Sequence, residues 1–107
     1  MDDATFDKIA REELLYLEEQ FMDVDPDEVD VSSSDGVLKL DLRDGVRVVI
    51  NSHRAARQIW MAAIADAWHF NPDPDDGRWR TSSDPPAELR STVKQLIRER
   101  LDLDVPL

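Results

Sequence analysis

The stretch VDVSSSDGVLKLDLRDGVRVVIN, residues 29–51, decides the fold of this chain. Within it, valine and leucine alternate with polar residues, and a period of two is typical of β-strands that bury one face. Ser34-Asp35-Gly36 and Asp44-Gly45 interrupt the alternation, and glycine supplies the positive φ that tight hairpin turns need. The pattern therefore predicts three antiparallel strands joined by two hairpins, the third strand covering 46–51.

Further strands are predicted downstream of this meander. Short runs at 58–63 and 68–71 are followed by a turn rich in Pro, Asp and Gly at 71–77 and by a last strand at 78–80. Residues 56–67 are rich in alanine, so helix propensity alone would favour a helix there. We predict strand instead, because the sheet would otherwise end after three strands.

Two amphipathic helices flank the strands. Residues 3–23 have apolar side chains within one arc of a helical wheel, and Pro26 ends that helix. Ser83-Asp84-Pro85 predicts the start of a second helix, capped by Asp84, that runs through Arg100. The tail 103–107 is apolar at alternate positions and should lie extended beside the helices. The predicted fold class is α+β, a two-layer sandwich with both helices on one face of a single antiparallel sheet of about six strands.

Composition excludes several classes of function. A chain of 107 residues makes one domain, 1–107, and the absence of cysteine excludes disulfides, thiolate metal sites and thiol catalysis. There is no phosphate-binding glycine loop, and the two histidines lack the acid pattern of a catalytic base, so we expect neither an organic cofactor nor a catalytic site. The chain carries no signal peptide pattern and no apolar run of about 20 residues, so we expect a cytoplasmic bacterial protein without membrane contact.

The negative charge is concentrated at one end of the chain. Residues 1–30 hold 12 of the 24 acidic side chains and two basic ones, a net charge of −10 out of the total of −11. Like charges at helical spacing destabilise a helix, so this concentration indicates a cationic guest, either a metal ion or a basic protein surface, rather than an ordinary solvated face. The same charge argues against nucleic acid as a partner.

Carboxylate oxygens suit ferrous, ferric, manganese, calcium or magnesium ions. Side chains on one convex face cannot encircle an ion, so binding should be weak and rich in water. An EF-hand starting at Asp23 is rejected, because Glu28 and Ser34 stand where that loop needs Gly and a bidentate Glu.

Three runs carry a resemblance to a known family: Val48-Val49-Ile50-Asn51, then Gln58-Ile59-Trp60-Met61-Ala62, then Trp68-His69-Phe70. With the acidic helix before them, they make nearly the whole chain similar to the frataxin family, in particular its bacterial CyaY branch. The resemblance implies an adaptor and regulator of iron-sulfur cluster assembly that binds ferrous and ferric iron weakly. It also implies partners, namely the cysteine desulfurase and the iron-sulfur scaffold protein. We expect a monomer and leave open whether it forms oligomers with iron.

The resemblance also assigns residues. The positions that match the family's iron-binding surface, which we call the acidic ridge, are Asp3, Asp7, Glu18, Glu19, Asp23, Asp25, Asp27, Glu28 and Asp30. The residues expected to contact partner proteins are Glu18, Glu19, Asp23, Asn51, His53 and Trp60. On its pattern alone Trp60 is a core residue, whereas the resemblance places it on the open face of the sheet. His69 is interpreted as structural.

The chain departs from the family pattern at several positions. His53 replaces a common Gln, Ala55 replaces a Pro, Asp66-Ala67 replaces a Gly pair, Met22 replaces a ridge acid, and Glu13 faces the apolar side. Two other functions were weighed. One is a ferroxidase or iron-storage oligomer, which lacks support because the chain has no Glu-x-x-His pair. The other is an acidic interaction module without iron, including one that imitates nucleic acid.

Overall fold

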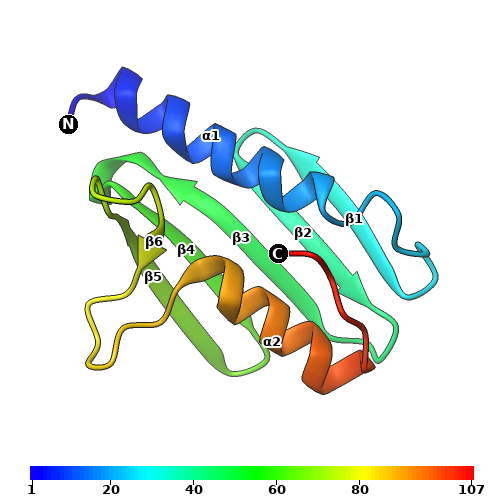
Figure 1. Cartoon of the computed structure of the whole chain (residues 1–107). Coiled ribbons are helices and arrows are strands. Elements are labelled where there is room, and N and C mark those ends of the chain that lie inside the picture. The colour runs from blue at the N-terminus through cyan, green and yellow to red at the C-terminus, as the bar shows by residue number, and fades with distance from the viewer.

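Six antiparallel strands form one sheet in the order β1-β2-β3-β4-β5-β6, so every strand pairs with its neighbour in the chain (Figure 1). The computed structural model describes all residues, 1–107. Its strands are β1 (Val29–Ser34), β2 (Val37–Leu42), β3 (Arg47–His53), β4 (Gln58–Ala63), β5 (Asp66–Pro72) and β6 (Trp79–Arg80). Helices α1 (Asp3–Glu19) and α2 (Leu89–Leu101) lie on the same face of the sheet, and a short 3-10 turn, η1 (Arg54–Ala56), joins β3 to β4.

The core lies between the helices and the inner face of the sheet. Alternate residues of β2, β3 and β4 are buried there, as the period of two predicts. The largest fully buried side chains are Trp79, Phe6, Phe70, Leu17, Leu38, Leu40, Ile50, Ile59, Met61, Leu89, Ile97 and Val29. Val105 in the C-terminal tail is also buried, and the tail returns between the two helices as expected (Figure 1). The predicted two-layer α+β fold is confirmed.

The first helix is shorter than predicted. Asp2 caps its start by accepting a hydrogen bond from the Thr5 amide, but α1 ends at Glu19, four residues before the predicted end at residue 23. The amides of Phe21 and Met22 bond three residues back, to Glu18 and Glu19, and this tighter winding ends the α-helix. Phe21 is thereby seated in the core.

The start of the second helix was predicted wrongly. Helix α2 begins at Leu89, and its cap is Glu88, whose carboxylate accepts from the Arg90 and Ser91 amides. Asp84 and Pro85 lie in the preceding loop, because a residue before proline is pushed away from helical backbone angles and Pro85 is followed by Pro86.

Strand bounds differ from the predictions by one or two residues. The third strand extends to His53, and β5 begins at Asp66 and ends at Pro72. Arg78 lies outside the short last strand. The alanine-rich segment is strand β4 at 58–63, as predicted. Neither helix is long and apolar enough to cross a membrane.

Candidate functional site

The acidic ridge is distributed along α1, the connection after it, and the first edge strand. Asp3 and Asp7 lie in the first turns of α1 and Glu18 and Glu19 at its end, while Asp30 lies in β1. The connection, residues 20–28, carries Asp23, Asp25, Asp27 and Glu28. A hydrogen bond of 2.9 Å from the Ser33 hydroxyl to Glu18 Oε2 joins the end of α1 to β1. Asp30 follows the buried Val29 on β1, so its side chain points to the open face of the sheet.

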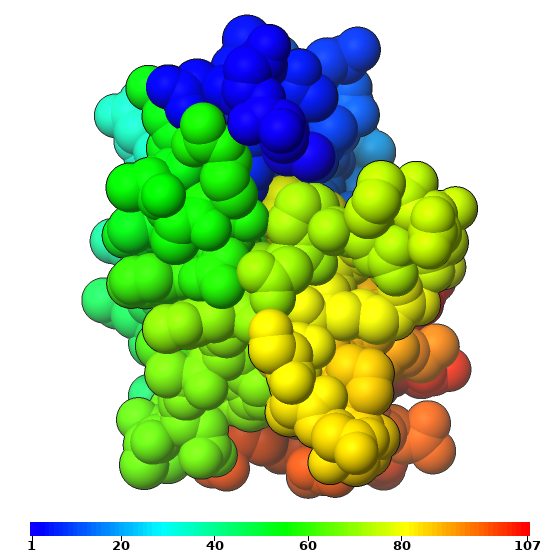
Figure 2. All heavy atoms as spheres, turned by 90° about the vertical axis from the view of Figure 1, so that its left-hand side faces the viewer, coloured from blue at the N-terminus to red at the C-terminus, as the bar shows by residue number.

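Three ridge carboxylates have arginine partners. Arg54 Nε donates to Asp7 at 3.0 Å, and this pairing raises the pKa of Arg54. Arg57 pairs with Asp3, and Arg43 pairs with Glu28 at 3.1 Å. Figure 2 shows the contact region of the first two pairs, where the first turns of α1 (blue) lie directly against the segment around η1 (green). The first two pairs fasten the segment around η1 to α1, and the third joins the connection to the turn after β2.

The other six ridge carboxylates have no cationic partner. They are Glu18, Glu19, Asp23, Asp25, Asp27 and Asp30, of which all but Glu18 are exposed. The Asp25 carboxylate accepts only from the Asp27 amide, at 2.9 Å, and the Glu18 carboxylate accepts only from the Ser33 hydroxyl. The uncompensated charge therefore gathers at the end of α1, in the connection and on β1.

The carboxylates do not converge into a closed metal site. No group of three or more His, Asp or Glu side chains is placed so that it could hold one ion. An ion bound to the ridge would therefore have one or two protein ligands and complete its shell with water, which agrees with the weak binding expected from a convex face.

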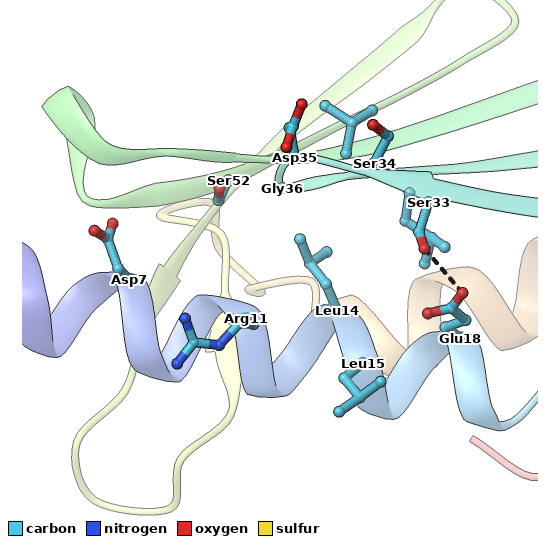
Figure 3. A pocket seen from close by; sticks show the side chains of 12 residues that line it. Asp7, Arg11, Leu14, Leu15, Glu18, Ser33, Ser34, Asp35, Gly36 and Ser52 are labelled. Carbon is cyan, nitrogen blue, oxygen red and sulfur yellow. Dashed lines mark hydrogen bonds between the residues drawn. The ribbon is translucent and has the colours of Figure 1, made fainter.

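A groove of about 570 Å³ runs beside the ridge, between α1 and the β1–β2 hairpin (Figure 3). Leu14 points from the helix toward the hairpin, and Glu18 reaches Ser33 across the groove. The turn Asp35-Gly36 forms its upper wall, with positive φ at both residues, as its hairpin sequence predicts. Leu15, which is 51% exposed, also lines the groove and was not among the predicted site residues. An apolar residue outside the apolar arc of α1 is expected to be exposed, and this position could have identified Leu15.

The predicted sheet-side residues lie on the open face. Ile59 and Met61 are buried under the helices, so Trp60 between them points the other way and is half-buried. The expectation from pattern alone, that Trp60 is a core residue, is therefore wrong, and strand alternation is the reason. Asn51 lies directly opposite Trp60 in the register of β3 and β4.

Two histidines stack on that tryptophan. The ring centroids of His53 and Trp60 are 3.9 Å apart with an interplanar angle of 13°, and those of Trp60 and His69 are 4.2 Å apart at 10°. His53 also caps η1, because its Nδ1 accepts from the Ala56 amide at 3.3 Å. A place for His69 beside Trp60 was not predicted, because it follows from the register of the β4–β5 hairpin, which pairs the two residues.

Comparisons with known proteins agree with the fold. The frataxin-like domain family model matches residues 1–103. The iron-sulfur cluster assembly protein CyaY of Ralstonia pickettii is 31% identical over 110 residues, covering 100% of this chain and 95% of that protein. CyaY of Pseudomonas fluorescens is 32% identical over 100 residues, covering 94% of this chain and 89% of that protein.

Two solved structures share the architecture. Frataxin from Psychromonas ingrahamii superposes with a TM-score of 0.88 at 20% identity, covering 98% of this chain and 96% of that one. Trimeric frataxin from the yeast Saccharomyces cerevisiae, complexed with ferrous iron, gives a TM-score of 0.67 at 24% identity, covering 96% and 88%. The chain therefore belongs to the frataxin family, and its CyaY relatives are iron-sulfur cluster assembly proteins.

Proposed function

We propose that this chain is an iron-binding adaptor that regulates iron-sulfur cluster assembly through its acidic ridge and has no catalytic site of its own. The observation that carries the proposal is the group of six ridge carboxylates without a cationic partner. Unneutralised charge of one sign opposes folding, and a positive guest relieves that repulsion. Membership in the frataxin family supports iron and a basic protein surface as the guests.

Iron is the cargo in this proposal. Carboxylate oxygens are hard ligands that suit ferrous and ferric ions, and one or two of them per ion give weak binding that leaves most of the shell to water. The yeast relative whose structure contains ferrous iron supports the choice of metal. Release to an acceptor is then easy, because few protein bonds have to break.

The partner in this proposal is the cysteine desulfurase complex with its scaffold protein. The charged end of the ridge, around Glu18, Glu19 and Asp23, steers toward a basic patch on the desulfurase, which makes association fast and sensitive to salt. Asn51, His53 and Trp60 lie on the open sheet face and contact the scaffold. The two surfaces are on different sides of the sheet, so one molecule can contact both partners.

Charge reversal tests the proposal. In the triple variant Glu18→Lys, Glu19→Lys and Asp23→Lys, iron binding by anaerobic calorimetry and modulation of desulfurase turnover should both be lost. The matched control changes three exposed acids outside the ridge, Asp75, Asp84 and Glu99, to Lys, and it should keep both activities. Unchanged iron binding together with unchanged modulation in the ridge variant would refute the mechanism. Oxygen consumption during ferrous titration of aerated samples of the same proteins would instead favour the ferroxidase alternative.

A further inference from the structure

Three rings stand in one stack across three neighbouring strands of the open sheet face. Trp60 on β4 is covered on one face by His53, at 3.9 Å, and on the other by His69, at 4.2 Å, and both contacts are nearly parallel. Because each face of the indole already has a partner, no further ring or cation can stack on Trp60. The indole therefore presents only its edge to a binding partner.

Hydrogen bonds fix the orientation of the stack. The Trp60 indole N–H donates to Gln58 Oε1 at 2.8 Å, and Gln58 Nε2 donates to Asn71 Oδ1 at 3.0 Å. Asn71 Nδ2 in turn donates to the Ser82 hydroxyl at 3.1 Å. The indole N–H is therefore used within the protein, and the ring is held both by its faces and by its one polar atom.

The surroundings of the stack differ in charge from the ridge. The cross-strand row that contains Trp60 and His69 is Val37, Asn51, Trp60 and His69, and the adjacent row is Lys39, Val49, Ala62 and Ala67. Neither row contains a carboxylate, although the chain carries a net charge of −11. The rim of an aromatic ring is the positive part of its quadrupole, so ring edges attract hydrogen-bond acceptors.

We infer that His53 and His69 are positioning residues that hold Trp60 edge-on. The edge of the indole is then presented, in a fixed orientation, to a scaffold surface made of hydrogen-bond acceptors. Backbone carbonyls, carboxylates or thiolates of the partner fit the edge of the indole, whereas aromatic or cationic side chains have no free indole face on which to stack. The inference rests on the proposed function, because the scaffold contact itself belongs to that proposal.

Replacing the outer ring of the stack tests the inference. His69 is exposed, so His69→Ala should leave the urea unfolding midpoint unchanged while the indole N–H resonance of Trp60 shifts and broadens in NMR spectra. Scaffold affinity should fall by roughly five- to tenfold, the cost of ordering one freed side chain on binding. His69→Phe keeps an aromatic ring in the stack and should restore both the resonance and the affinity. Desulfurase binding through the ridge should be unaffected.

The outcomes separate this inference from the proposed function. If Trp60→Ala weakens scaffold binding while His69→Ala binds like the wild type, the positioning role is refuted and the scaffold contact stands. If Trp60→Ala also binds like the wild type, the scaffold contact is refuted and the inference with it. If His69→Phe is as weak as His69→Ala, stacking is not the basis of the effect. An acceptor-free scaffold surface at the contact, mapped by NMR on the labelled scaffold, would refute the chemistry assigned to the partner.

Discussion

Replacing Arg90 by methionine removes one half of the buried contact that joins the two helices. Glu13 on α1 is 4% exposed, and its two oxygens accept hydrogen bonds of 3.0 and 2.8 Å from Arg90 on α2. The guanidinium carbon also lies 3.7 Å from the centroid of the Tyr16 ring. The hydrogen bond to Glu13 raises the pKa of Arg90, so the arginine stays charged at any pH at which the protein folds. The variant leaves the Glu13 carboxylate buried without a partner.

The expected loss is large for this small domain. Breaking a buried ion pair by removing one partner costs about 3 to 5 kcal/mol of unfolding free energy. For a domain near 100 residues, a loss of about 3 kcal/mol lowers Tm by roughly 12 to 24 °C. Replacing both charges by apolar side chains of similar volume is often neutral, so the double variant Glu13→Leu with Arg90→Met should recover most of the loss.

Urea unfolding of the wild type, both single variants and the double variant at pH 7 gives the coupling energy, which should be about 2 to 3 kcal/mol. The matched control is Arg98→Met on the same helix. The Arg98 side chain is 61% exposed and lies 3.7 Å from Asp102, and loss of such a surface pair should change stability by less than about 0.5 kcal/mol. Additive losses in the double variant, or an Arg90→Met variant as stable as the control, would refute the reasoning.

Three further predictions concern local features. Ile64 has φ +57° and is 68% exposed in the turn between β4 and β5, so Ile64→Gly should stabilise the protein by about 1 kcal/mol in urea unfolding, and a destabilised variant would contradict this. The hydrogen bond from Arg80 lowers the pKa of Asp76 from 3.8 to about 2, so stability from this group is present above pH 3.8 and is lost as pH falls to about 2. The acid unfolding curve of Asp76→Asn should therefore be flatter in that range, and an unchanged curve would contradict it. Added salt should raise Tm by screening the ridge, and less so in Glu19→Gln with Asp23→Asn; equal responses would show that the ridge is not strained.

The sequence was most informative where structure is local. The hairpin at Asp35-Gly36 and the strand at 58–63 were predicted correctly, because turn glycines and alternating side chains act over a few residues. The start of α2 was predicted wrongly because proline favours the first turn of a helix but disfavours helical angles in the residue before it, and both effects apply at Pro85. The end of α1 was predicted wrongly because the tighter winding after Glu19 depends on the packing of Phe21 in the core. Packing against the rest of the molecule sets such helix ends, and no local sequence pattern predicts them.

The sequence by itself determined the α+β architecture and the end of the chain that carries the charge, since periodicity and composition fix both. Only the tertiary structure decided which carboxylates have a cationic partner and which remain uncompensated. Asp7 pairs with Arg54, which is 47 residues away in the sequence, and Glu13 pairs with Arg90, which is 77 residues away. Glu19 and Asp23 have no cationic partner. The tertiary structure also placed Trp60 between the imidazole rings of His53 and His69. Such pairings follow from strand register and helix docking, which bring together side chains whose separation in sequence carries no signal of contact.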